Sequence, residues 1–260
     1  MNILIKGAGD LATGVAHRLK RCGFNIVMTE IDMPTTVRRT VAFSQAVYDK
    51  EVEVEGIKAI LAQGSKEVKN IMEDGNIAVI VDKEAKIINE IKVDVVVDAI
   101  IAKKNLGTSI NDAKVVIALG PGFYAGKDCH CVVETQRGHY LGKCIYSGKA
   151  IDNTGIPGNI GGYTVERIIR ATDDGVINPI CSIGDNVKTG QVVAYVGDSE
   201  VKASIDGTIR GMLQKGVVVH KNMKSGDIDP RCEKNHCFTI SDKARSIAGG
   251  VLEAILYLHK

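Results

Sequence analysis

The chain has 260 residues and a formal net charge of +2, and 45% of its residues are hydrophobic. That composition supports a buried core, whereas balanced charge and an aromatic content of 4% without tryptophan argue against nucleic-acid binding. The chain enters a strand pattern at once, has no run of 18 apolar residues and has seven irregularly spaced cysteines, so we expect no signal peptide, membrane span or disulfide framework, and a cytoplasmic protein.

The opening segment "MNILIKGAGDLATG" predicts a strand, a glycine turn and a helix. Residues 3–5 are apolar, and the apolar positions between 11 and 19 have helical spacing, with Gly23 closing the helix. Gly7 and Gly9, with Ala12 as the small third residue, match the pattern G-x-G-x-x-G/A. In that pattern the glycines permit a tight turn and let a pyrophosphate approach the backbone.

The segment "FNIVMTEID" predicts a second strand, and Glu30 at its end stands where a ribose hydroxyl would bind. Asp10 has two interpretations: its carboxylate suits the positive end of the helix dipole and caps the helix, but it also competes with a phosphate. The residues that we expect to bind the nucleotide in this part of the chain are Gly7, Gly9, Asp10, Leu11, Ala12 and Glu30.

Further apolar segments continue an alternation of strands and helices. We expect a helix over 35–49 and strands over 77–82, 93–101 and 114–119, the last ending near Gly120 and Gly122. Near-continuous apolar strands are typical of parallel sheets that are covered on both faces. The predicted fold is therefore α/β, a Rossmann-like doubly wound parallel sheet.

The pattern changes after residue 130. A hairpin is expected over 130–148, a helix over 158–172, and then short strands separated by glycines. A last helix starts at the N-cap Ser241 and contains the pair Gly249-Gly250, which predicts close packing against another element. The expected domains are a Rossmann-like domain with a hairpin extension over 1–171, a small β domain over 172–240 and a C-terminal helix over 241–260.

The carboxyl ends of the strands provide further candidates, because ligands of doubly wound sheets bind there. Gly120 and Gly122 lie in such a position and are expected to contribute to the cofactor site. Asp98 and Lys103 could perform acid–base chemistry, although a strand-end cap and a surface lysine are the preferred interpretation.

Two arginines, Arg38 and Arg39, follow the second strand, where a ribose or its phosphate would lie. Guanidinium groups suit phosphates, and adjacent helical positions point about 100° apart, so one of the two is expected to contact a ligand. The alternative is a pair of solvated arginines.

The remaining polar motifs favour structural roles. Cys129 and Cys131 would share a strand face with His130 on the other, and one Cys-x-Cys is poor evidence for zinc, so no metal is expected. The segment "GDIDPRC" places Asp227, Asp229 and Arg231 around a proline turn, for which a structural role is expected and a cleft role is the alternative.

The segments "GDNVKTGQVVA" and "EVKASIDGTIRGM" resemble the biotinyl/lipoyl carrier family, which implies a small barrel-sandwich domain. That family carries its modified lysine seven residues before the alanine of the second motif. Counting back from Ala203 reaches Val196, so we expect no biotin or lipoate and a module that is structural or acts as a lid.

Segments throughout the chain, among them "IKGAGDLATGVAHRL", "PTTVRRTVAFSQAVYD", "ALGPGFYAGKDCH" and "SDKARSIAGGVLEAIL", resemble the YqeB family. The resemblance implies a cytoplasmic accessory protein for the maturation of selenium-dependent molybdenum hydroxylases, with a hydroxylase as partner. The glycine turn with Glu30 adds a molybdopterin-type nucleotide or NAD(P) as the expected cofactor. The alternative is an NAD(P)-dependent oxidoreductase or transferase acting on a small molecule, although no Tyr-x-x-x-Lys signature is present.

Overall fold

The computed structural model describes residues 1–259, which form two compact units. Unit 1 comprises Met1–Pro34, Ala42–Thr154 and the chain from Ile240 on, and unit 2 comprises Thr35–Val41 and Gly155–Thr239. Each unit therefore contains segments that are far apart in the sequence. The described part of the chain contains no helix with the length and apolar character needed to cross a bilayer.

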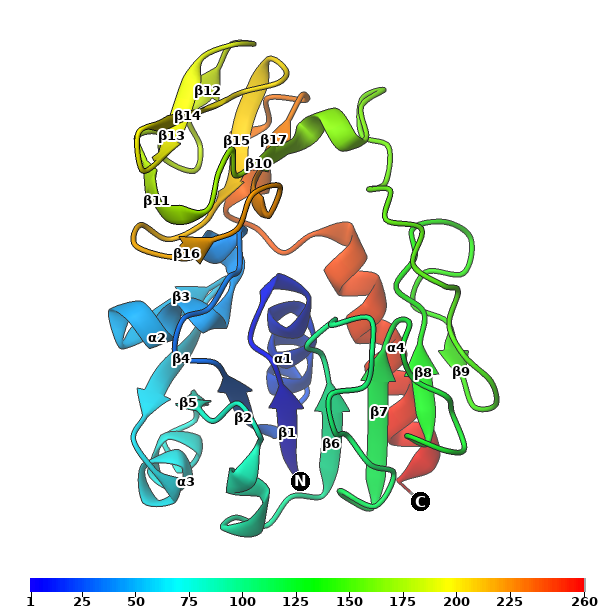
Figure 1. The fold of residues 1–260 in the computed structure, drawn as a ribbon. Helices are drawn as coiled ribbons and strands as arrows, with labels where there is room; N and C mark the ends of the chain where they lie inside the picture. The colour runs from blue at the N-terminus through cyan, green and yellow to red at the C-terminus, as the bar shows by residue number, and fades with distance from the viewer. Residues whose placement is uncertain (260) are drawn as a thin grey trace. The chain divides into compact units, whose positions relative to one another are not determined.

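Unit 1 is built on a nine-stranded sheet within the described residues, in the order β3-β4-β5-β2-β1-β6-β7-β8-β9 (Figure 1). The strands from β4 to β8 in this order are parallel. The bounds are β1 Asn2–Lys6, β2 Asn25–Glu30, β3 Glu51–Val54, β4 Ile57–Ala62, β5 Ile77–Val81, β6 Val95–Asp98, β7 Val115–Leu119, β8 Cys131–Val133 and β9 Cys144–Ile145.

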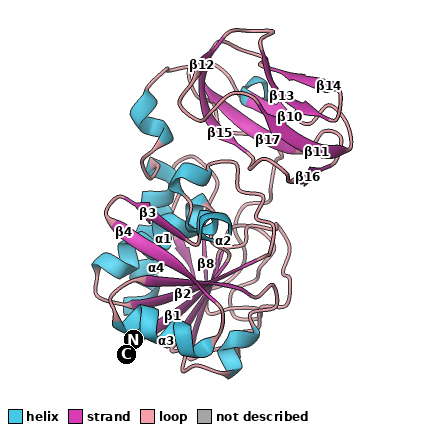
Figure 2. Cartoon of the chain, turned by 90° about the vertical axis from the view of Figure 1, so that its left-hand side faces the viewer, coloured by secondary structure: helices cyan, strands magenta, loops and turns pink. Residues whose placement is uncertain are grey.

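The helices of unit 1 are α1 Asp10–Arg21, α2 Ala46–Asp49, α3 Ser65–Glu73 and α4 Asp242–Leu258. Alternate strand residues such as Leu4 and Val96 join a buried cluster with Val68 and Met72 of α3. Helices α1 and α4 pack on each other, and α4 also covers β7 and β8 (Figure 2). The predicted N-cap is confirmed, because the Ser241 hydroxyl accepts a hydrogen bond from the Ala244 N–H.

Unit 2 contains two four-stranded sheets within the described residues, in the orders β10-β17-β15-β12 and β14-β13-β11-β16. Neighbouring strands in both sheets run antiparallel. The bounds are β10 Ile168–Arg170, β11 Gly175–Pro179, β12 Asn186–Val187, β13 Val192–Val196, β14 Ser199–Lys202, β15 Gly207–Met212, β16 Val218–Val219 and β17 Lys224–Asp229.

The predicted fold class, a Rossmann-like doubly wound parallel sheet followed by a barrel-sandwich domain, is wrong. The sheet of unit 1 is mixed, because β3 pairs antiparallel with β4 and β8 pairs antiparallel with β9. The β3–β4 hairpin turns at Glu55 and Gly56, which both have positive φ, as a two-residue hairpin turn requires. The second part of the chain forms separate antiparallel sheets.

Two predicted helices are also absent from the described residues. Over 35–49 the chain forms the 3₁₀ turns Arg39–Val41 and Phe43–Gln45 and the one-turn helix α2. The Val37 carbonyl accepts a hydrogen bond from the Met212 N–H of β15, so the start of this segment serves unit 2. Over 158–172 a 3₁₀ turn, Val165–Arg167, leads into β10, which pairs with β17.

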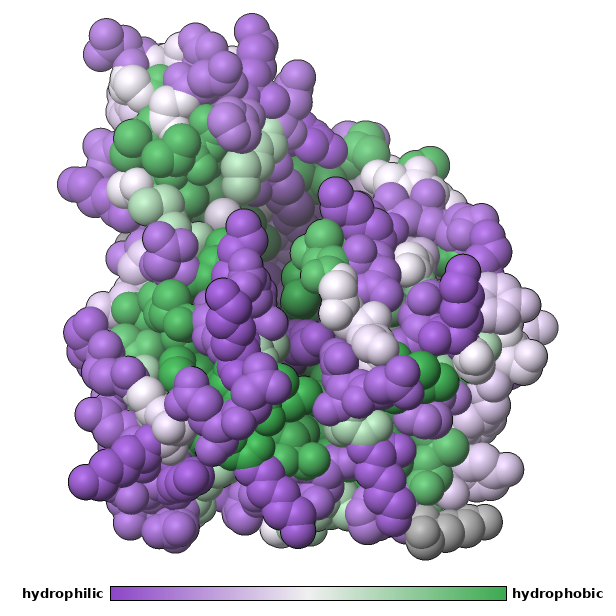
Figure 3. All heavy atoms as spheres, turned by 60° about the horizontal axis from the view of Figure 1, so that its bottom comes forward, coloured by the Kyte–Doolittle hydropathy of each residue, from purple (hydrophilic) through white to green (hydrophobic). Residues whose placement is uncertain are grey.

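Other predicted elements are confirmed: β1, α1, β2, β5, β6 and β7 form where the sequence patterns place them, and the strands among them are parallel. Most residues of these strands are buried, as expected for strands covered on both faces, although Val81 at the end of β5 is exposed. Hydrophilic side chains cover most of the molecular face in Figure 3, and smaller apolar patches lie between them. Scattered surface apolar groups of this kind are normal in folded proteins.

Candidate functional site

Acidic side chains stand at the carboxyl ends of several parallel strands of unit 1, and their oxygens accept hydrogen bonds from backbone N–H groups of the adjoining loops. These bonds fix the loops at one edge of the sheet, which is where the predicted site residues of unit 1 lie. The acidic residues are Glu30, Asp82, Asp98 and Glu134. Asp82 and Glu134 are not among the predicted site residues, although both directly follow an apolar strand.

The turn after β1 is held by one hydrogen bond to a backbone carbonyl and one to an acidic side chain. The Gly7 N–H donates to the Thr29 carbonyl at 2.9 Å, and the Ala8 N–H donates to Glu30 Oε2 at 2.9 Å. Gly7 has a φ of +89°, and a Cβ there would lie 3.1 Å from the Ala99 carbonyl oxygen, so this position requires glycine. Contacts within the protein therefore fix the conformation of this turn.

The sequence predicts that Glu30 contacts a ribose, whereas in the structure its carboxylate binds the protein's own backbone. Both carboxylate oxygens accept backbone hydrogen bonds, from Ala8 and from Ile31. Burial raises the pKa of Glu30, and the two backbone bonds oppose that rise. Its contact with a ribose stays a prediction, because each oxygen has a second lone pair.

Helix α1 begins without a side-chain cap at Gly9, whose backbone is extended. The Thr13 N–H donates to the Gly9 carbonyl at 2.8 Å, which is the first bond of the helical ladder. The backbone N–H groups of Leu11 and Ala12 come before this first ladder bond, in the turn where a helix has no residue one turn earlier to accept from them. Asp10 places the acidic side chain of that turn at the positive end of the dipole.

Asp98 is buried at the end of β6 and belongs to a network that contains Lys6 instead of Lys103. The Thr108 hydroxyl donates to Asp98 at 2.6 Å, and Lys6 Nζ donates to the same hydroxyl at 3.0 Å and to Asp112 at 2.9 Å. Burial raises the pKa of Asp98, and the Thr108 hydrogen bond opposes that rise. Lys103 is exposed and has a φ of +62°.

Gly120 and Gly122 follow β7, and both have positive φ. A Cβ at Gly120 would collide with the Thr135 hydroxyl, and one at Gly122 would lie 2.6 Å from the Lys104 nitrogen. Close approach of the protein's own backbone and side chains therefore explains both glycines, whereas their predicted contact with a cofactor stays a prediction.

Arg38 and Arg39 belong to unit 2 and donate to backbone carbonyl groups. Arg38 Nη2 lies 3.0 Å from the carbonyl oxygens of His236 and Thr239, and Arg39 Nε lies 3.2 Å from that of Met212. Arg38 is buried and Arg39 is half-buried, so the alternative interpretation of two solvated arginines is wrong.

The segment containing Asp227, Asp229 and Arg231 is also in unit 2, where β17 carries both aspartates. Arg231 binds Asp229 through two nitrogen atoms, at 2.9 and 2.6 Å. Two arginines that were not predicted as site residues accompany them, Arg167 and Arg210, and both are buried. No local motif marks either residue, because strand pairing alone brings them next to β17.

The cysteine motif lies in the core of unit 1. Cys129 and Cys131 are fully buried, and burial raises the pKa of Cys129 to about 12, while His130 Nδ1 accepts a hydrogen bond from the Val116 N–H. Cys131 and Cys144 interact through their thiols, which raises the pKa of Cys131 and lowers that of Cys144. Among residues 1–259, no group of three histidine, cysteine or acidic side chains could hold a metal ion.

Comparison with solved structures gives weak similarity. An aspartoacylase family protein from Mesorhizobium loti is 12% identical, with a TM-score of 0.28, over 87% of this chain and 84% of that one. A succinylglutamate desuccinylase/aspartoacylase from Rhodobacter sphaeroides is 11% identical, with a TM-score of 0.27 and the same coverage. No protein-family model matches the chain.

Sequence comparison gives a much stronger relationship. The chain is 52% identical over 256 residues to the uncharacterized protein YqeB of Escherichia coli. The aligned region is 98% of this chain and 47% of that protein, so the chain spans about half the length of its curated relative. This identity supports the resemblance to the YqeB family over nearly the whole chain.

Proposed function

We propose that the chain is an accessory protein that handles a nucleotide or pterin-nucleotide cofactor for selenium-dependent molybdenum hydroxylases. Support for this role comes from the resemblance of its motifs to the YqeB family and from the identity of 52% to a protein of that name. The cofactor class, the hydroxylase as partner and a cytoplasmic location are parts of the proposal.

The observation that carries the proposal at the level of residues is the start of α1. Gly9 supplies no capping side chain, and the turn before it is fixed by Glu30 and Thr29. An anion placed at a helix N-terminus accepts bonds from first-turn N–H groups and is favoured by the helix dipole. The phosphate of the cofactor would bind there, against Gly9, Leu11 and Ala12.

Replacing Gly9 by valine tests this site. The backbone at Gly9 is extended with a φ of −66°, so a side chain causes no φ strain there and would occupy the space of the phosphate. Gly64 provides the matched control, because it is the N-cap of α3, has extended backbone and has open space around it. Valine costs helix capping at both positions but should remove ligand binding only at Gly9.

The measurement is calorimetric titration with NAD, nucleoside triphosphates and pterin nucleotides. The unmodified chain and Gly64→Val should bind at least one of them, and Gly9→Val should not. A chain that binds none of these compounds contradicts the phosphate site. The accessory role has a separate test, which measures the molybdenum and selenium content of the hydroxylase in a deletion strain. That content should fall while the hydroxylase protein remains present. Unchanged content contradicts the role.

A further inference from the structure

Unit 2 contains a group of charged side chains, here called the arginine cluster, that gathers from four separate segments of the chain. Two aspartates of β17 lie at its centre, and arginines surround them. Its members are Arg38, Arg167, Arg210, Asp227, Asp229 and Arg231.

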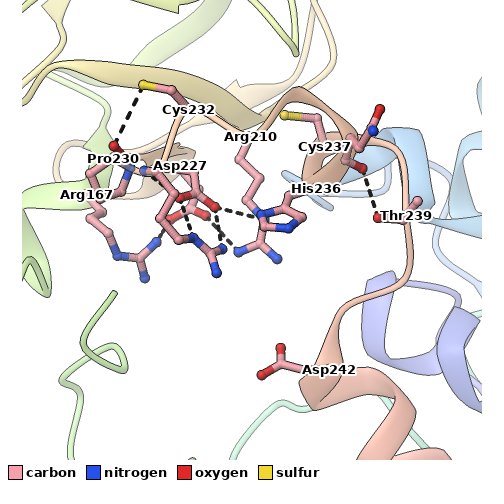
Figure 4. A network of polar contacts seen from close by, with 12 residues as sticks. Arg167, Arg210, Asp227, Pro230, Cys232, His236, Cys237, Thr239 and Asp242 are labelled. Atoms are coloured by element: carbon pink, nitrogen blue, oxygen red, sulfur yellow. Dashed lines mark hydrogen bonds and ion pairs between the residues drawn. The ribbon is translucent and has the colours of Figure 1, made fainter. Parts of the chain in front are cut away.

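The two carboxylates of the cluster already have arginine partners. Arg167 Nη1 donates to Asp227 Oδ1 at 3.0 Å, and Arg231 binds both oxygens of Asp229. Asp227 and Asp229 stand two residues apart on β17, so their side chains share one face of the sheet. Figure 4 shows Arg167 and Arg210 on opposite sides of Asp227.

Arg210 is left without a hydrogen bond to either carboxylate. Its closest approaches are 3.9 Å from Nη1 to Asp227 and 3.8 Å from Nε to Asp229, which are beyond hydrogen-bond distance. Arg210 is 8% exposed, and its Nε is buried with no hydrogen-bond partner among residues 1–259. Burying a charged guanidinium costs free energy of desolvation, and without hydrogen bonds to the two carboxylates that cost is not fully offset.

The cluster also has excess positive charge. Three guanidinium groups, those of Arg167, Arg210 and Arg231, lie next to two carboxylates, a formal charge of +1. Burial lowers the pKa of Arg210, and the charge of Arg38 lowers it further, so these two arginines repel each other. Two more buried nitrogens in this part of unit 2, Arg167 Nε and His236 Nδ1, lack a partner within residues 1–259.

We infer that the arginine cluster binds a phosphate group. A negatively charged tetrahedral oxyanion would offset the excess charge and accept bonds from the unpaired guanidinium N–H of Arg210 and from Arg167. Arginine suits this ligand because its planar fork matches the spacing of two phosphate oxygens. Arg231, with a side chain 42% exposed, lies at the solvent side of the site. The inference is independent of the proposed phosphate site at α1, since the residues belong to unit 2.

The test is thermal unfolding of the whole chain in a phosphate-free buffer, with inorganic phosphate, adenosine monophosphate or acetate added at equal ionic strength. Inorganic phosphate should raise Tm, and acetate should not. A rise with adenosine monophosphate as well identifies a phosphomonoester as ligand, and a rise with inorganic phosphate alone identifies the free ion. No rise with either, or an equal rise with acetate, overturns the inference.

Variants of Arg210 separate a ligand site from a structural ion pair. In Arg210→Met the aspartates keep Arg167 and Arg231, so Tm without phosphate should equal or exceed that of the parent chain. Phosphate affinity should fall about ten- to a hundredfold, as expected for loss of charge-assisted bonds. Arg170→Gln is the control, because Arg170 is an exposed arginine on β10 that donates to a backbone carbonyl.

Arg210→Lys provides a second variant that keeps the charge and loses the fork, and its phosphate affinity should fall between those of the parent and Arg210→Met. If Arg210→Met does not fold, Arg210→Lys alone decides: an affinity equal to that of the parent overturns the inference. Gly9→Val should keep the phosphate response, so failure of this site and failure of the α1 site are distinguishable.

Discussion

Arg167 and Asp227 form an ion pair of 3.0 Å whose side chains are only 6% and 7% exposed. The pair connects the turn before β10 to β17, two elements that are 60 residues apart in the chain. Removing one partner of a buried pair leaves the other charge without compensation, which costs much more than the pair itself contributes.

We therefore predict that Arg167→Met destabilises unit 2 by about 3 kcal/mol. Urea unfolding followed by a probe in unit 2 measures this change. The double variant Arg167→Met/Asp227→Leu should recover only part of the loss, because it removes the uncompensated carboxylate but also takes away an acidic group that lies 3.9 Å from the buried Arg210. Lys188→Met is the control at an exposed pair with Asp206, and should leave the transition unchanged. If Lys188→Met lost as much stability as Arg167→Met, burial would not explain the loss.

Glu30 makes a prediction about pH. Burial raises its folded-state pKa above the ordinary value of 4.5, so between those two values the folded chain binds more protons than the unfolded chain. The contribution of Glu30 to stability therefore falls as the pH rises through this window. Glu30→Gln cannot ionise, so the difference in unfolding free energy between parent and variant should change in that window and level off above it. A difference that stays constant from pH 4 to 8 would refute the raised pKa.

The adjacent glycines of α4 should respond in opposite directions. A Cβ at Gly250 would collide with the Gly142 carbonyl and would lie 2.9 Å from Val133, whereas the nearest atom at Gly249 is Arg18 Nη1 at 3.5 Å. Gly250→Ala should therefore destabilise unit 1 by about 1–3 kcal/mol through overpacking.

Gly249→Ala should stabilise unit 1 by about 0.5–1 kcal/mol, because alanine loses less backbone entropy in a helix. Denaturant titration of the two variants side by side measures both changes. Of the two glycines, only Gly250 packs closely against another element. A loss of stability in Gly249→Ala would contradict this assignment.

The resemblance to biotinyl carriers leads to a prediction about covalent modification. Val196 ends β13 and pairs with Ser199 across the turn, and Lys202 forms an ion pair with Glu200 at 2.8 Å. Since a valine stands at the expected position of the modified lysine, the intact mass should equal that of the unmodified sequence. A mass increased by one biotin or lipoate, in a strain that modifies its own carriers, would show that the prediction is wrong.

Local sequence patterns alone predicted those helices and strands that depend on a few neighbouring residues. The apolar runs of β1, β2 and β7 and the Ser241 cap of α4 are examples, because burial and capping act on neighbouring residues. The glycine turn at Gly7 was also correctly predicted, since a positive φ there favours glycine. The antiparallel hairpin at Glu55 and Gly56 was missed although its alternating pattern is present in the sequence.

Only the tertiary structure decided how the polar residues combine. The sequence singled out Arg38, and the fold placed it in the same cluster as Arg210, a residue that no local motif marks. Likewise, Asp98 was paired with Lys103 by proximity in the chain, but Lys6 from the neighbouring parallel strand reaches its network instead. The physical reason is that strand pairing brings together residues about a hundred positions apart in the chain. Charged groups interact according to their separation in space, which the spacing of residues in the sequence does not give.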